Sequence, residues 1–119
     1  MTAKISTYYL VGNKLTIDRD ADARLDYSMN MSKWLEAADP AGDTLQSAEV
    51  VEQVGVHTVA FDGTAWTPST AVEVFDSGRK WRVWVSGGTA GEPASVTVRF
   101  TTAGRRVDDR TIHFKVVGR

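Results

Sequence analysis

The feature that most constrains the fold is a strict alternation of apolar and polar residues near the C-terminus. Every second residue is large and apolar from Val96 to Phe100, and the pattern returns from Ile112 to Val116. A period of two indicates strands that bury one face. Gly104 lies between the two runs and is expected to supply the positive φ of a tight reversal. Residues 94–102 and 109–117 are therefore predicted to form a β-hairpin.

Shorter runs with the same period occur upstream. In residues 81–86, Val83 and Val85 share one predicted face with Trp81, and the run ends at a glycine-rich loop, residues 87–91. Four further runs are predicted to be strands, and the last two of them are either two strands or one strand with a bulge: 25–31, 71–75, 44–51 and 54–60.

The N-terminal region carries a weaker signal. Residues 14–17 are a weak strand candidate, and residues 5–11 are expected to form a strand or an arm. Ser32 is placed to cap a short helical turn over residues 32–38. With about seven strands and at most one helical turn, the predicted fold is all-β, a single immunoglobulin-like β-sandwich. The expected domain organisation is an N-terminal arm or first strand at residues 1–17, followed by the immunoglobulin-like sandwich domain at residues 18–119.

Composition excludes several classes of function. The net charge of −1 offers no excess that would attract nucleic acid or an anionic membrane, so neither is an expected partner. The chain has no cysteine, which rules out disulfides and thiolate metal sites. The first ten residues lack the features of a signal peptide, and no run of apolar residues is long enough to span a bilayer. We expect the chain to be made and folded in the cytosol.

Two patterns suggest a metal site but do not complete one. Asp18, Asp20 and Asp22 open like a calcium loop, yet the sixth position is Ala23 instead of glycine, and the twelfth is Met29 instead of glutamate. The only histidines, His57 and His113, have no second histidine or cysteine at ligand spacing. No metal or other cofactor is predicted.

Catalytic arrangements are also missing from the sequence. No nucleophile elbow surrounds a serine, and the loop 87–91 lacks the Gly-Lys-Ser/Thr ending of a phosphate-binding loop. Asp108 and Asp109 are adjacent, so a strand would point them to opposite faces. The chain is therefore predicted not to be an enzyme.

Exposed aromatic and basic residues are the remaining candidates for function. Trp84 has the opposite parity to Val83 and Val85, so it either marks a contact surface on the outer face or lies on a covered face. Two arginines lie in the predicted hairpin turn, where the plainer interpretation is a solvated turn that protects a sheet edge. The candidate protein-contact residues are Tyr8, Tyr9, Trp66, Trp84, Arg105 and Arg106.

Four segments in a fixed order resemble a family of small virion proteins of tailed bacteriophages, described as fibre-to-tail adaptors. The resemblance covers roughly residues 18–117, and the segments that carry it are residues 25–35, 42–45, 83–91 and 101–110. It implies an immunoglobulin-like domain in the neck or tail of the particle that binds other virion proteins without catalysis.

The predicted function is accordingly that of a phage virion structural protein, a neck or tail adaptor that links tail and fibre or head-tail proteins. The expected partners are other virion proteins, and copies are expected to form a homo-oligomeric ring in the particle. A capsid decoration protein and a carbohydrate-binding β-sandwich are the alternatives. The expected location is the virion, after synthesis in the host cytoplasm.

Overall fold

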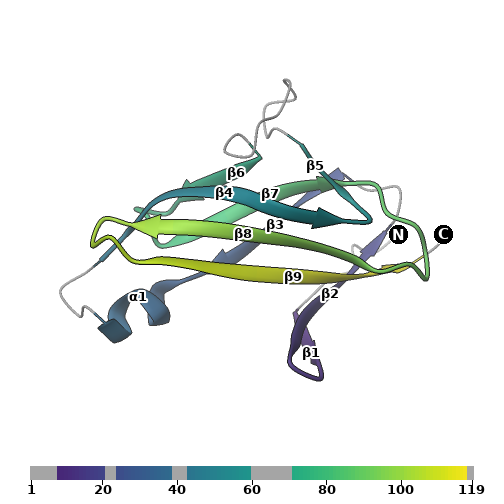
Figure 1. Ribbon diagram of the computed structural model, residues 1–119, viewed down its shortest axis with the longest axis horizontal. Coiled ribbons are helices and arrows are strands. Elements are labelled where there is room, and N and C mark those ends of the chain that lie inside the picture. The colour runs from purple at the N-terminus through teal and green to yellow at the C-terminus, as the bar shows by residue number, and fades with distance from the viewer. Residues whose placement is uncertain (1–7, 21–23, 39–42, 60–70, 118–119) are drawn as a thin grey trace.

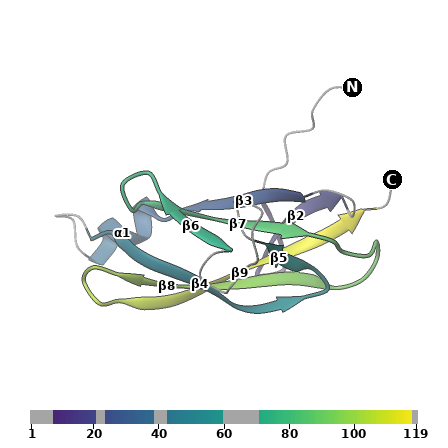
Figure 2. The same ribbon diagram turned by 90° about the horizontal axis from the view of Figure 1, so that it is seen from above.

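The computed structural model describes residues 8–20, 24–38, 43–59 and 71–117, which form two β-sheets and one short helix. Figure 2 shows the sheets as two layers, with β3, β6 and β7 in one and β4, β8 and β9 in the other. The predicted all-β, immunoglobulin-like sandwich is confirmed.

The larger sheet has five strands in the order β1-β2-β9-β8-β4 (Figure 1). Strands β2 and β9 run parallel, and the other neighbouring pairs are antiparallel. The sheet therefore pairs an N-terminal strand, β2, with the C-terminal strand β9. Its edge strands are β1 and β4. Its strands are β1 (Tyr9–Val11), β2 (Lys14–Asp20), β4 (Leu45–Val54), β8 (Ala94–Thr102) and β9 (Val107–Val117).

The smaller sheet is organised around β7, which pairs with β3 along one edge and with β5 and β6 along the other. All of these pairings are antiparallel. Its strands are β3 (Arg24–Asn30), β5 (His57–Val59), β6 (Val72–Phe75) and β7 (Lys80–Ser86).

The connectivity accounts for the immunoglobulin-like class. If β1 and β5 are set aside, seven strands remain, the number in a constant-type immunoglobulin domain. In that domain the second, fifth and fourth strands share one sheet, and the third, sixth and seventh share the other. The second, fifth and fourth of them (β3, β7 and β6) form one sheet, and the third, sixth and seventh (β4, β8 and β9) form the other. The first, β2, pairs with the last, β9, and so joins the larger sheet.

The C-terminal hairpin agrees with its alternating pattern. All six predicted inward residues are buried, and four of them are fully so: Val96, Val98, Phe100 and Ile112. The prediction for the turn was wrong in one detail: Arg105, with φ of 67°, takes the left-handed conformation, and Gly104 does not. Gly104 instead lies close to Asp43: a Cβ there would be 3.0 Å from a carboxylate oxygen of Asp43, which would have to shift by a few tenths of an ångström.

The core lies between the sheets and draws on both. Trp81, Val83 and Val85 of β7 are fully buried, as the alternation in residues 81–86 predicts. They belong to one hydrophobic cluster with Val96 and Val98 of β8. Burial of apolar area at this scale is the main favourable contribution to folding of a chain without disulfides.

The structure decides two alternatives that the sequence leaves open: whether residues 44–60 hold one strand or two, and whether the N-terminal segment is a strand or an arm. Residues 45–54 form a single strand, β4, with register shifts after Leu45 and after Val50, while His57–Val59 forms the separate strand β5. At the N-terminus, β1 and β2 form a hairpin, and β2 runs without a break from Lys14 to Asp20. Ile17 of β2 lies in the core.

The helical turn is present as α1 (Ser32–Ala38). Ser32 is its first helical residue, and the side-chain oxygen of Asn30 accepts a hydrogen bond of 2.9 Å from the Ser32 amide. The cap is therefore supplied two residues before the predicted one. Leu35 packs into the core and fixes α1 across the end of the sandwich beside the β8–β9 turn (Figure 1).

Candidate protein-contact surfaces

Arg106 binds inward, to the helix end of the sandwich. Its Nε donates to Asp43 at 3.1 Å, and its terminal nitrogens donate to the carbonyls of Trp34 and Leu35 at 3.5 and 3.2 Å. The guanidinium also stacks on the Trp34 ring. Because Leu35 is one of the last four residues of α1, its carbonyl has no acceptor role within the helix, and Arg106 supplies it with a donor. A partner-contact role for Arg106 stays a prediction beside this structural one.

Asp43 is the centre of the same junction. Its carboxylate accepts hydrogen bonds from the amides of Gly104 (2.8 Å) and Thr44 (3.0 Å). The Thr102 hydroxyl is the strongest of the groups that hold the pKa of Asp43 down, to about 2, and Gly104 and Arg106 add to its effect. Sequence reasoning did not single out Asp43. The signal in the sequence was that residues 42–45, which lead into β4, are one of the four segments that carry the family resemblance.

A second charged residue, Arg19 of β2, is buried inside the sandwich with an exposed fraction of 1%. Its Nε donates to the Gly87 carbonyl at 3.0 Å, and a terminal nitrogen donates to the Tyr27 hydroxyl at 2.9 Å. Burial raises the pKa of Tyr27, and the neighbouring guanidinium partly opposes that effect. Through these hydrogen bonds, Arg19 and Tyr27 hold β2, β3 and the β7–β8 loop together, which is a structural role.

The two predicted tyrosines occupy different environments. Tyr8 packs against the core and donates its hydroxyl to the Ser28 carbonyl at 2.8 Å, and burial raises its pKa. Tyr9 is exposed on β1, and its hydroxyl donates to Asp18. That hydrogen bond is the main reason why the pKa of Tyr9 is raised. Of these two tyrosines, only Tyr9 has an exposed ring that a partner could contact, because the Tyr8 ring is packed against the core.

Trp84 lies on the outer face of β7, as its parity predicts. It is half-buried, and its register partners are Asp26 on β3 and Val59 on β5. Arg105 is exposed at the tip of the β8–β9 turn. Trp66 lies outside the described residues. The five predicted contact residues that the structure describes therefore do not form one patch.

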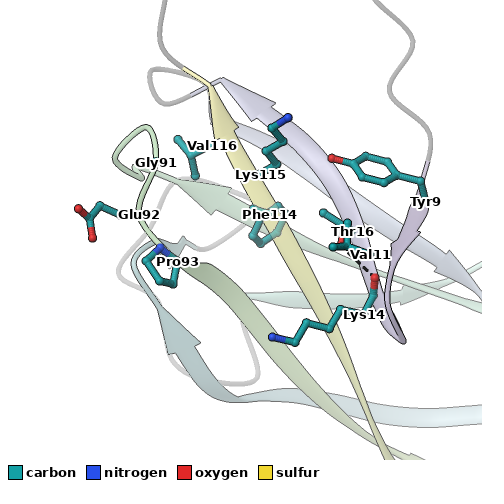
Figure 3. A pocket seen from close by; sticks show the side chains of 10 residues that line it. All are labelled: Tyr9, Val11, Lys14, Thr16, Gly91, Glu92, Pro93, Phe114, Lys115 and Val116. Carbon is teal, nitrogen blue, oxygen red and sulfur yellow. Dashed lines mark hydrogen bonds between the residues drawn. The ribbon is translucent and has the colours of Figure 1, made fainter.

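A groove of about 670 Å³ lies along β9 at the end of the sandwich opposite α1, and its lining includes Phe114, Lys115 and Val116. Figure 3 shows Tyr9, Val11 and Lys14 along one side of it and Glu92 and Pro93 along the other. Apolar carbon predominates in its lining, with lysines at the rim. Sequence reasoning missed the groove, because its walls come from β1, β2, β9 and the β7–β8 loop, which meet only in the fold.

The two basic residues at the start of β7 are paired with acids. Arg79 pairs with Glu36 at 3.1 Å, and Lys80 pairs with Asp76 at 3.3 Å. Asp108 and Asp109 point to opposite faces and pair with different arginines, Arg110 and Arg99. They do not form an acid/base pair.

No group of three or more potential metal-ligating side chains occurs within residues 8–20, 24–38, 43–59 and 71–117. Asp18 is bonded to Tyr9, and Asp22 lies outside those ranges. His57 is exposed, whereas His113 is half-buried, and burial and the nearby Lys14 lower the pKa of His113. In the described part of the chain, no helix is long and apolar enough to cross a membrane.

The fold is an immunoglobulin-like sandwich whose larger sheet has β1 and β4 as its edges and whose surface carries a groove along β9. Residues 19–115 match the model of a protein family described as podophage GP4 fiber-tail adaptor protein gp77. The chain belongs to this family of phage fibre-tail adaptors, and its role is that of a structural tail adaptor of the virion. A search of curated proteins finds no match.

Proposed function

We propose that the protein is a non-catalytic adaptor in the neck or tail of the phage particle, where it joins fibre subunits to tail or head-tail proteins. The family match over residues 19–115 is the observation that carries this proposal. The groove along β9 fits the role, because it is shallow and has a mostly apolar lining, as a surface for a protein partner does.

We also propose that several copies form a ring around the tail axis. An adaptor between a tail and its fibres must present repeated binding sites, and cyclic symmetry supplies them with one kind of subunit. An immunoglobulin-like sandwich suits such a ring, since its sheet edges and outer faces remain for different neighbours.

The groove and the residues around it are the proposed contact sites for other virion proteins. Tyr9 stands on its rim and combines an apolar ring with a polar hydroxyl, a combination favoured at interfaces. Trp84 and Arg105 lie on other parts of the surface and are proposed as contacts for a different neighbour. Trp66 is retained as a proposed contact from the sequence alone.

Purified particles provide the direct test. Mass spectrometry is expected to detect the protein at a fixed number of copies per particle, and cryo-electron microscopy to place it between tail and fibre density. Absence of the protein from infectious particles would refute the adaptor proposal. Density on the capsid surface would assign it to decoration instead.

A binding assay separates the remaining alternative. The isolated protein is expected to bind tail or fibre subunits in pull-down experiments, and Tyr9→Ala is expected to weaken one of these interactions at least tenfold without loss of fold. Binding to a glycan array with no affinity for virion proteins would favour a carbohydrate-binding module.

A further inference from the structure

We propose that neighbouring copies of this chain associate head to tail through the two edges of the larger sheet. In this arrangement β1 of one protomer pairs antiparallel with residues 52–54 of β4 in a second copy. The inference rests on the proposed ring and specifies which surfaces form it.

Both edges carry exposed apolar side chains. Leu10 and Val11 of β1 are 69% and 57% exposed, and Val51 and Val54 of β4 are 40% and 43% exposed. Among the described residues, β1 pairs only with β2, and β4 pairs only with β8. Each edge therefore offers main-chain groups together with apolar surface, a combination that favours the addition of a strand.

The register places the two edges at the same height in the sandwich. Val54 is opposite Ser95, Ser95 is opposite His113, His113 is opposite Thr16, and Thr16 is opposite Tyr9. These five residues form one row across the sheet. A second copy placed beside the first would therefore bring Val54 next to Tyr9 without a shift along the strands, as a ring requires and a rising helix does not.

Strand direction and length also agree. The pairings make β4, β9 and β2 run one way and β8 and β1 the other, so β1 beside β4 of an identically oriented copy is antiparallel. The irregularity after Val50 leaves residues 52–54 as a regular three-residue stretch at the end of β4, and β1 is also three residues long. The expected pairs between copies are Tyr9 with Val54, Leu10 with Gln53 and Val11 with Glu52.

Opposite charges complete the match. Lys14 is the register partner of Val11, and Glu52 is exposed on the facing edge. Within the described ranges neither Lys14 nor Glu52 forms an ion pair. Figure 3 shows Lys14 extending across β9, away from β1, so in the proposed register its side chain turns toward Val11 to reach Glu52 of the second copy. The register shift after Val50 and the charge of Glu52 discourage the β4 edge from pairing with unrelated strands. They favour a short strand that carries a lysine nearby, as β1 does.

The absence of cysteine makes a cross-linking test clean. Val11→Cys and Glu52→Cys are introduced into one chain, in the phage and in the purified protein. Three strands separate β1 from β4, a distance of four strand spacings of about 4.8 Å, so the two thiols cannot join within one molecule. Mild oxidation is expected to yield a ladder of dimers, trimers and larger species on a non-reducing gel.

The matched control combines Val11→Cys with Glu49→Cys, because Glu49 is exposed on the same strand but lies before the irregularity. It is expected to stay monomeric under the same oxidation. Cross-linking of the control to the same extent, or a monomeric Val11/Glu52 variant in particles that contain it, would overturn the proposed register.

Charge reversal gives a second measurement that needs no cysteine. Lys14→Glu and Glu52→Lys alone are each expected to weaken self-association in sedimentation experiments at least fivefold, and the double variant is expected to restore it. Circular dichroism checks that each variant folds. Equal self-association of all variants would contradict the proposal.

The two proposals fail in different ways. If particles lack the protein, the adaptor role is refuted, and cross-linking of the concentrated purified protein then decides the edge pairing: a ladder supports it and a monomer refutes it. If particles contain the protein but show no ladder, the adaptor role survives and the edge pairing does not.

Discussion

The guanidinium carbon of Arg106 lies 4.1 Å from the centroid of the Trp34 ring, and that ring packs nearly perpendicular to Phe100, with 5.2 Å between ring centroids. A surface arginine of the last hairpin is thus connected through one tryptophan to the centre of the core. The contact fastens α1 to the β8–β9 turn and makes this end of the sandwich a single packed unit.

Replacement of Arg106 by alanine is therefore expected to lower the free energy of unfolding by about 2 kcal/mol, since it removes the stacking and the hydrogen bonds to the helix carbonyls. Urea titration measures the change. Arg105→Ala is the matched control, because Arg105 is exposed beside it, and a change within about 0.5 kcal/mol is expected there. Equal effects of the two substitutions would contradict the role assigned to Arg106.

Asp43 makes stability depend on pH in acid. Its pKa in the folded protein is about 2, below its ordinary value of 3.8, so the folded state binds the proton more weakly than the unfolded chain. The resulting stabilisation is fully present above about pH 5 and is lost as the pH falls toward 2. Asp43→Asn is expected to remove this dependence. The difference in urea midpoint between wild type and variant should shrink from pH 5 to pH 2, and a constant difference would refute the assignment.

Gly55, in the turn after β4, has a φ of 69° and no room for a side chain. A Cβ there would clash with the carbonyl oxygen of Pro93. Gly55→Ala is expected to cost about 2 kcal/mol or more, from left-handed strain together with the clash. Gly12 has a φ of 62° but open space around it, so Gly12→Ala isolates the strain, at about 1 kcal/mol. Thermal unfolding of both variants tests the ranking, and equal losses would contradict it.

Phe100 tests the centre of the core. It is fully buried between the sheets, so Phe100→Ala is expected to cost about 3–5 kcal/mol through lost burial and a residual cavity. Phe75 is half-buried on β6 and stacks on Arg82, so Phe75→Ala is expected to cost less than half as much. Denaturant unfolding followed by tryptophan fluorescence compares them. A larger loss for Phe75 would place the core elsewhere.

Local patterns were sufficient for most of the strands. The alternation in β7, β8 and β9 predicted their buried faces, because a half-buried strand must place apolar side chains at every second position. The hairpin turn shows the limit of such reasoning. Gly104 was expected to take a positive φ, but contact with Asp43, 61 residues away, gives it a different role.

Contact surfaces were harder to predict, since exposure depends on what the fold lays over each residue. Tyr8 and Tyr9 are neighbours in the sequence, but one packs on the core and the other stands on an edge strand. Arg106 looked like a solvated turn residue and has its side chain against α1.

The sequence by itself determined the all-β class, the alternating faces of the C-terminal hairpin and the resemblance to phage adaptors, because these follow from periodicity and from the order of short segments. Tertiary structure alone decided which strands become edges, how Asp43 and Arg106 meet, and where the groove lies. The physical reason is that pairing between distant strands and the burial of charge depend on contacts between residues far apart in the chain, which no local pattern records.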